Sequence, residues 1–362
     1  MTRIRTSRVT DFAALGERWR ALEARAACSF FQTWTWTGCL ARERFPDPIL
    51  VEALDADETV ALALFNRRRG FPADRLFLGE SGDPALDRVY IEYNDVLTVP
   101  GREAALASAC LRAARHGRID GERPGLPRDL VLSGMPGPIP SGLGGVASIR
   151  ETRRAPHVDL MAVRAGGGDY LARRSANTRQ QLRRSDRAFA AAGPLRLHRA
   201  GTVAEAHEML DAMIPLHQAA WTARGEPGCF ADPFFARFHH ALIERGMERG
   251  EIDLLRVEAG PSCVGILYNF AFRDHALAYQ SGFDYAAAEG PMKPGLTCHH
   301  QAILSALARG MNRYDFLAGD DRYKRSLSDG DAIMSWFGVD SIWSPRRTGR
   351  CLAAWLRRRA AA

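Results

Sequence analysis

The sequence predicts an α+β fold in which an antiparallel sheet is combined with amphipathic helices. Three strand-like runs, 252–259, 263–272 and 275–283, follow one another through short turns, which is typical of an antiparallel meander. Apolar residues at helical spacing mark the segments on either side of this meander. The chain has 362 residues and exceeds the usual size of one hydrophobic core, so we expect two domains.

The first half predicts a mixture of helices and short strands. A helix is expected at 11–26, because Phe12, Leu15, Trp19 and Leu22 recur at helical spacing. We interpret the aromatic residues that follow as core: Phe30, Phe31, Trp34 and Trp36. The other expected elements are strands at 49–54, 59–65, 75–79, 90–99 and 129–133, a helix at 102–116, and loops at 121–129 and 134–145.

The second half shows a clearer succession of elements. Three glycines at 166–168 mark the expected boundary between domains 1–165 and 166–342, which precede a basic tail at 343–362. The segment 175–193 predicts a helix that begins at a Ser or Asn cap and ends at Gly193. The remaining expected elements are strands at 195–199, 311–317 and 333–339, helices at 203–221, 234–250 and 296–309, and a loop at 319–330.

The composition excludes several classes of protein. Hydrophobic residues make up 46% and charged residues 25%, which matches an ordinary globular protein and argues against wholesale disorder. No stretch approaches the roughly 20 apolar residues that cross a bilayer, and no apolar run follows the early arginines as in a secretory signal. We therefore expect a cytoplasmic protein, with a peripheral contact at the inner membrane as an open alternative.

Cysteines and histidines give no sign of a metal site or a disulfide framework. The seven cysteines are scattered and form no C-x-x-C motif. The adjacent pairs His239–His240 and His299–His300 point about 100° apart on a helix, so neither pair faces one ion. We expect no metal.

The choice of cations is unusual. Of 49 Lys and Arg residues only Lys293 and Lys324 are lysines. One explanation of this bias is a GC-rich genome, in which surface cations are encoded as arginine. Alternatively, a surviving lysine marks a place where a compact ammonium is needed in place of a planar guanidinium. Both interpretations stay open at this point.

Several blocks of the second half resemble the CelD-type branch of the GNAT acetyltransferases, which is related to FemAB-like transferases. The resemblance spans about 160 residues in order and spacing, and YIEYNDVL (90–97) adds a weaker match in the first half. It implies two tandem GNAT-like domains, the first non-catalytic and shaping the acceptor cleft, the second binding acyl-CoA. The matching blocks are NTRQQLRR (177–184), WTARGEPGCFADP (221–233), YQSGFD (279–284), KPGL (293–296) and YDFLAGDDRYK (314–324).

The expected acyl-CoA site lies at the start of the helix at 296–309. The usual GNAT phosphate loop reads Q/R-x-x-G-x-G/A, whereas this chain has GPMKPGLT at 290–297. The free N–H groups of a helix start attract phosphate, and Lys293 adds a positive charge. An ordinary Pro-Gly turn is the alternative. The residues expected to bind the donor are Gln280, Ser281, Gly282, Lys293, Gly295, Leu296 and Thr297, with Gly282 suited to a bulge or a close backbone approach.

The loop at 319–330 is the expected place of the chemistry. Amine acylation needs a neutral amine and a thiolate that is protonated as it leaves. Asp320 is expected to accept the amine proton and Tyr323 to donate to the thiolate. Lys324 is expected to bind an anionic acceptor group or to hold the loop. A surface ion pair between Asp320 and Lys324 is the alternative.

Acceptor binding is assigned to residues on two predicted helices and one strand. Arg179 and Arg183 share a helix face and suit a phosphate or carboxylate, although a run of charges is usually only solvated. Trp221 and Arg224 form a second pair, in which the tryptophan also suits a core position. Asp95 belongs to the matching segment of the first half.

The resemblance implies an acyl-CoA-dependent N-acyltransferase whose acceptor is an amine of cell-envelope, exopolysaccharide or lipid metabolism. The alternatives are an aminoacyl-tRNA-dependent FemAB-like transferase, a sphingoid-base-type long-chain amine N-acyltransferase, and a non-catalytic partner in polysaccharide assembly. No nucleic-acid-binding motif is present. The tail at 343–362 suits a basic amphipathic helix on anionic membrane or, equally, a frayed end.

Overall fold

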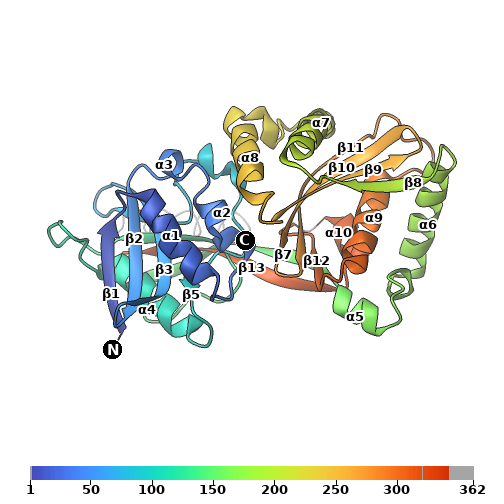
Figure 1. Cartoon of the computed structure of the whole chain (residues 1–362). Coiled ribbons are helices and arrows are strands. Elements are labelled where there is room, and N and C mark those ends of the chain that lie inside the picture. The colour runs from blue at the N-terminus through green and yellow to red at the C-terminus, as the bar shows by residue number, and fades with distance from the viewer. Residues whose placement is uncertain (1, 320, 342–362) are drawn as a thin grey trace, which may run out of the picture. The chain divides into compact units, whose positions relative to one another are not determined.

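The computed structural model describes residues 2–319 and 321–341 (Figure 1). The chain forms two compact units. Unit 1 consists of Met1–Thr152 and Met334–Ala362, and unit 2 consists of Arg153–Ile333. Unit 2 is therefore continuous in sequence, whereas unit 1 is made of two segments.

Unit 1 is built around a mixed sheet with the strand order β1-β2-β3-β4-β6-β13. The first four strands are antiparallel to their neighbours, β4 and β6 run parallel, and β13 is antiparallel to β6. Its strands are β1 (Thr2–Arg8), β2 (Pro48–Asp55), β3 (Glu58–Arg68), β4 (Arg75–Leu78), β5 (Leu97–Thr98), β6 (Asp129–Met135), the first part of β7 (Val146–Asp159) and most of β13 (Gly330–Asp340). Its helices are α1 (Phe12–Glu23), α2 (Trp34–Thr37), α3 (Ala41–Arg44) and α4 (Glu103–His116).

Alternation along the strands gives unit 1 a core on each face of its sheet. Val51 and Ala63 pack into the core with α4, whereas Leu50 and Leu62 pack into the core with α1. This is the period of two that a strand buried on both faces requires. Trp34 belongs to the α1 core, and Trp36 is fully buried, so the expected aromatic core is confirmed.

Unit 2 repeats the same sheet with other strands. Its order is β8-β9-β10-β11-β12-β7, in which the first four strands are antiparallel, β11 and β12 run parallel, and β7 is antiparallel to β12. The strands are β8 (Leu195–Arg199), β9 (Ile252–Ala259), β10 (Ser262–Phe272), β11 (His275–Phe283) and β12 (Arg313–Asp315). The helices are α5 (Leu160–Ala165), α6 (Ala176–Ala190), α7 (Val203–Thr222), α8 (Pro233–Gly246), α9 (Pro294–Ala308) and α10 (Arg322–Leu327).

The helices of unit 2 begin where the sequence provides caps. Ser175 accepts a hydrogen bond from the backbone N–H of Thr178 at the start of α6, which confirms the expected cap. Thr202 caps α7 in the same way through Glu205. Asp232 caps α8, whose first residue is Pro233.

The two sheets share one topology, and this confirms the expected tandem α+β architecture. In each unit a helix lies between the two parallel strands along the sequence: α4 between β4 and β6, and α9 between β11 and β12. The boundary between the units falls between Thr152 and Arg153, inside β7, and differs from the one expected at 166–168. That glycine run ends α5 within unit 2, where Gly167 and Gly168 have positive φ.

Two expected elements were wrong. The segment 90–99 contains only the two-residue strand β5, because Tyr90 and Tyr93 adopt positive φ and turn the chain. The segment 319–330 is not all loop, since α10 occupies Arg322–Leu327. The strands β1 and β7 and the helix α5 were not expected from the sequence.

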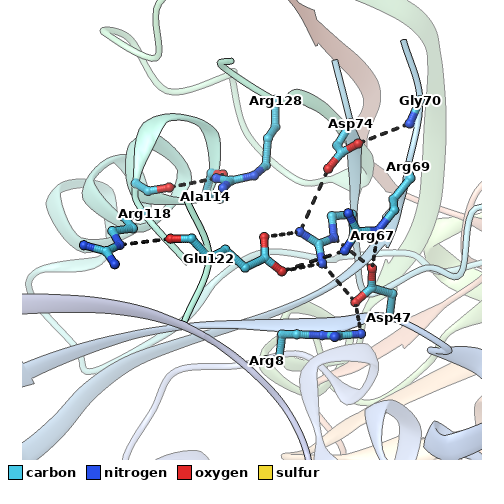
Figure 2. Close-up of polar contacts among 11 residues, drawn as sticks. Arg8, Asp47, Arg67, Arg69, Gly70, Asp74, Ala114, Arg118, Glu122 and Arg128 are labelled. Atoms are coloured by element: carbon cyan, nitrogen blue, oxygen red, sulfur yellow. Dashed lines mark hydrogen bonds and ion pairs between the residues drawn. The ribbon is translucent and has the colours of Figure 1, made fainter. Parts of the chain in front are cut away.

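A buried arginine joins several segments at one end of unit 1 (Figure 2). Arg67 on β3 is 1% exposed and makes a bidentate pair with Glu122 at 2.7 and 2.8 Å. Its Nε also donates to Asp47 at 2.8 Å, and Arg8 reaches the same carboxylate. These contacts raise the pKa of Arg67, chiefly through Glu122, so the guanidinium stays charged although it is buried.

Candidate functional site

The parallel strands of unit 2 pair over a short stretch only. β11 and β12 are paired from His275 to Leu277 and from Arg313 to Asp315. β12 ends there, where Asp315 accepts the N–H of Leu317, a residue with φ of 58°. β11 continues to Phe283, so its edge from 278 to 283 has no ladder partner on this side among the described residues.

Aromatic side chains line the region where the two strands separate. His299 on α9 stacks on Tyr323 with ring centroids 5.5 Å apart, and contacts Phe283 and Phe316. The Nδ1 of His299 is 2.9 Å from the hydroxyl of Tyr314. Burial lowers the pKa of His299 to about 3, and the charge of Lys324 lowers it further, so the ring is neutral.

The start of α9 offers unbonded N–H groups. Lys293 is the N-cap residue and gives no side-chain cap, and Pro294 is the first residue of the helix. The backbone N–H groups of Gly295 and Leu296 therefore have no partner within the helix and suit an anion. Lys293 is exposed beside them. These residues fit a phosphate group of the kind that acyl-CoA carries.

Two residues of α6 hold the start of α9 in place. The hydroxyl of Ser185 accepts the N–H of Lys293 at 2.9 Å and lies 2.9 Å from the hydroxyl of Thr297. The carboxylate of Asp186 accepts from Thr297 at 2.8 Å and is 2.7 Å from Nδ1 of His300. Thr297 is fully buried, and its hydroxyl is already bonded to α6. Of the residues expected to bind the donor, Thr297 therefore holds α9 in place.

The expected donor residues of β11 lie at the edge that separates from β12. The backbone carbonyl of Ser281 accepts a hydrogen bond from Nδ1 of His217 at 3.1 Å. A Cβ at Gly282 would lie 2.5 Å from the carbonyl of Met213 on α7, which confirms the expected close backbone approach. The bulge lies elsewhere, because the register shifts between Ala278 and Gln280 opposite Tyr268 and Asn269.

Tyr323 and Lys324 lie on α10 beside this edge. Burial raises the pKa of Tyr323, and the charge of Asp321 and the neighbouring Tyr285 raise it further, so the hydroxyl keeps its proton at neutral pH. Lys324 donates to the carbonyls of Phe316 and Ala318 at 2.9 and 3.0 Å. Lys324 thus ties α10 to the end of β12. Asp320 lies outside the described residues.

Trp221 and Arg224 form a stacked pair at the end of α7. The guanidinium lies over the indole ring at 5.5 Å from its centroid. Burial lowers the pKa of His217, and the charge of Arg224 contributes a smaller effect in the same direction. The sequence did not point to His217, Tyr285 or His299. The spacing of His217 puts it on the same helical face as Trp221 and Arg224, and this spacing could have linked His217 to that pair.

Three further residues were expected at the acceptor site. The guanidinium of Arg179 donates to the carbonyl of Arg174 at 2.8 Å, just before the start of α6. Arg183 is exposed. Asp95 lies in unit 1, where burial raises its pKa to about 6.

In unit 1 the corresponding space between the parallel strands is filled by the chain itself. β4 and β6 pair from Arg75 to Phe77 and from Asp129 to Val131. Beyond this point the side-chain amide of Asn94 donates to the carbonyls of Leu78 and Ser133 at 3.0 and 3.1 Å. Asp95 belongs to this inserted segment, 90–95.

The start of α4 also differs from that of α9. Its first turn carries Glu103, whose negative charge disfavours a phosphate. Of the two units, unit 2 therefore has the features of a donor site.

The described residues show no alternative type of site. No group of three or more His, Cys, Asp or Glu side chains is arranged for a metal ion in residues 2–319 and 321–341. The adjacent histidines diverge as expected, His299 towards Tyr314 and His300 towards Asp186. No helix within the described ranges is long and apolar enough to span a membrane.

The second unit matches a known protein family. Residues 176–325 match the family described as an acetyltransferase (GNAT) domain, from the start of α6 into α10. No curated protein matches the chain.

Solved structures share the fold of the whole chain. FemX is similar with a TM-score of 0.60 and 10% identity, over 92% of this chain and 96% of that chain. The C-terminal domain (DUF2156) of a lysylphosphatidylglycerol synthetase from Agrobacterium fabrum gives 0.53 and 12%, over 91% and 92%. L-PGS from Bacillus licheniformis gives 0.51 and 10%, over 92% and 94%. Residues 176–325 of unit 2 thus match the GNAT acetyltransferase domain, within a fold that the chain shares with FemX.

Proposed function

We propose that this protein is an N-acyltransferase that moves an acyl group from acyl-CoA to an amine. The observation that carries this proposal is the separation of β11 from β12 beside the start of α9, where Gly295 and Leu296 offer free N–H groups. An extended pantetheine chain has the shape and the hydrogen-bonding groups to pair with the open edge of β11. The phosphates would lie at the helix start, with Lys293 as the nearest added charge.

The residues around the strand ends support the transfer step. The protonated hydroxyl of Tyr323 supplies a proton to the departing thiolate, while Lys324 holds α10 against β12. Trp221 and Arg224 line the acceptor side, with Arg224 suited to a phosphate or carboxylate on the acceptor. The amine belongs to cell-envelope, exopolysaccharide or lipid metabolism, and a long-chain amine of the sphingoid type is one form of it.

A second candidate is an aminoacyl-tRNA-dependent transferase. The similarity to FemX over nearly the whole of both chains favours it, since the resemblance to FemAB-like transferases implies this donor. A peripheral contact of the tail with anionic membrane is a further proposal, and residues 342–362 lie outside the described part.

Thermal unfolding with different donors tests the donor assignment. We expect CoA, acetyl-CoA or palmitoyl-CoA to raise the melting temperature, because a ligand at 100 times its Kd stabilises the folded state by about 2.7 kcal/mol. Lys293→Gln is expected to weaken this effect, whereas Arg245→Gln, which removes an exposed charge from α8, serves as the matched control. Stabilisation by aminoacyl-tRNA alone would favour the second candidate, and no response to any donor would contradict both.

A further inference from the structure

His217 is a buried histidine on α7 with one nitrogen bonded and one free. The residue as a whole is 3% exposed. Nδ1 lies 3.1 Å from the carbonyl oxygen of Ser281 at the open edge of β11. Because a carbonyl oxygen only accepts hydrogen bonds, Nδ1 carries the proton. Nε2 has no hydrogen-bond partner among the described residues.

The surroundings keep this ring neutral. Burial lowers the pKa of His217, the bond to Ser281 opposes this effect, and the charge of Arg224 lowers the pKa further. In a neutral ring protonated at Nδ1, Nε2 carries a lone pair. The elements packed against α7 also carry His239 on α8, which contacts Phe230, and Tyr279 on β11, whose hydroxyl is 3.3 Å from Nε2 of His239. His239 is also neutral, since burial lowers its pKa to about 3.

The fold fixes the position of the ring at the strand end. α7 lies directly on β11 at Gly282, where a Cβ would meet the carbonyl of Met213 at 2.5 Å. His217 follows one turn later and packs against Trp221 and Phe230, with centroids 5.9 and 5.1 Å away. Trp221 in turn carries the guanidinium of Arg224 over its ring at 5.5 Å from the centroid, so a cation lies next to the aromatic group that holds His217.

We infer that Nε2 of His217 accepts the proton of the acceptor amine during acyl transfer. This inference rests on the proposed function. The amine nitrogen forms a bond to the acyl carbon, and the carbon–sulfur bond breaks. The amine proton passes to Nε2, and the thiolate takes the proton of Tyr323. Both side chains then return to their resting state by exchange with solvent, which leaves an amide and a free thiol.

Kinetics of two matched variants test this role. His217→Asn keeps a donor for the carbonyl of Ser281 and removes the acceptor at Nε2, and His207→Asn makes the same change earlier on α7. Thiol release is followed with acetyl-CoA or palmitoyl-CoA as donor and sphinganine or glucosamine as amine probe. We expect His217→Asn to lower kcat by about 100-fold or more, the usual contribution of a general base, and His207→Asn to keep the wild-type kcat.

The pH profile separates a chemical role from a structural one. The wild-type kcat is expected to fall as the pH drops below 6.5, when Nε2 becomes protonated, and His217→Asn is expected to lack this decline. A His217→Asn variant with the wild-type kcat would overturn the inference.

Nuclear magnetic resonance of ¹⁵N-histidine-labelled protein gives an answer without a substrate. A bare Nε2 on His217 at pH 7 supports the inference, and a protonated Nε2 with a bare Nδ1 overturns it. Wild-type protein that releases no thiol with any pair of probes would contradict the proposed function, and the resonance measurement would still decide the state of the ring.

Discussion

The carbonyl oxygen of Ile91 lies so close to Gly134 that a Cβ atom added at Gly134 would come within 2.5 Å of it. Gly134 also has φ of 65°, which side chains disfavour. The inserted segment 90–95 of unit 1 thus depends on a glycine at the end of β6. The same contact explains why unit 1 keeps a GNAT-like sheet without an open space between its parallel strands.

We predict that Gly134→Ala destabilises the protein more than a strained turn alone does. Gly121→Ala is the matched control, because Gly121 has φ of 80° and a Cβ there meets nothing within 4 Å. Positive φ at a non-glycine residue costs about 1–3 kcal/mol, and the clash adds to this at Gly134 only. Chemical denaturation measures both variants, and equal losses would contradict the role of the contact.

We predict that Arg67→Met lowers the free energy of unfolding by about 3–5 kcal/mol, since it leaves the carboxylates of Asp47 and Glu122 without their buried partner. Arg20→Met provides the comparison, because the pair of Arg20 and Glu17 is exposed and such pairs contribute at most about 1 kcal/mol. Urea denaturation of both variants is the measurement. Similar small losses would show that the cluster in Figure 2 is not stabilising.

Glu80 makes stability depend on pH. Burial and the neighbouring Asp87 raise the pKa of Glu80 to about 7, although Ser133 donates to its carboxylate. The folded state therefore holds this proton more tightly than the unfolded state, and the free energy of unfolding falls as the pH rises from about 4.5 to 7. We predict that Glu80→Gln is more stable than the wild type at pH 8 and gains nothing at pH 4. A gain of equal size at both values would contradict this assignment.

We predict that Tyr323→Phe lowers kcat in thiol release and leaves the melting temperature nearly unchanged. Phenylalanine keeps the ring that stacks on His299, so loss of the hydroxyl affects proton donation more than packing. An acyl thioester whose leaving thiol has a lower pKa than CoA, such as an S-phenyl thioester, should restore part of the rate. A Tyr323→Phe variant with full kcat would remove the acid assignment.

Local patterns were sufficient for most elements of unit 2. The expected strands at 252–259 and 275–283 coincide with β9 and β11, because short turns bound them and their alternation is regular. β1 has one apolar residue, Ile4, and pairs on one side only, so its sequence carries little strand signal. β7 is mostly exposed between 146 and 154, and its pairing with distant segments leaves no local pattern.

The site was only partly accessible to the same reasoning. Lys293, Gly295 and Tyr323 stand in recognisable blocks; the structure puts Gly295 next to Phe283 at the end of β11 and Tyr323 against His299. The role of His217 depends on which of its nitrogens is bonded, and that depends on how α7 rests on Gly282. Such a relation between residues 65 positions apart follows from tertiary packing, and a single sequence does not record it.

The position of β13 in the sequence determines which unit can be completed first during synthesis. The strand that pairs with β6 in unit 1 comes from residues 335–339, which leave the ribosome after all of unit 2. Unit 2 is complete in one continuous segment and can fold as soon as it emerges, whereas the edge of β6 stays open until residues 335–339 have emerged as well. A released chain that ends at residue 333 should therefore contain the whole of unit 2 and an N-terminal unit that lacks its last strand.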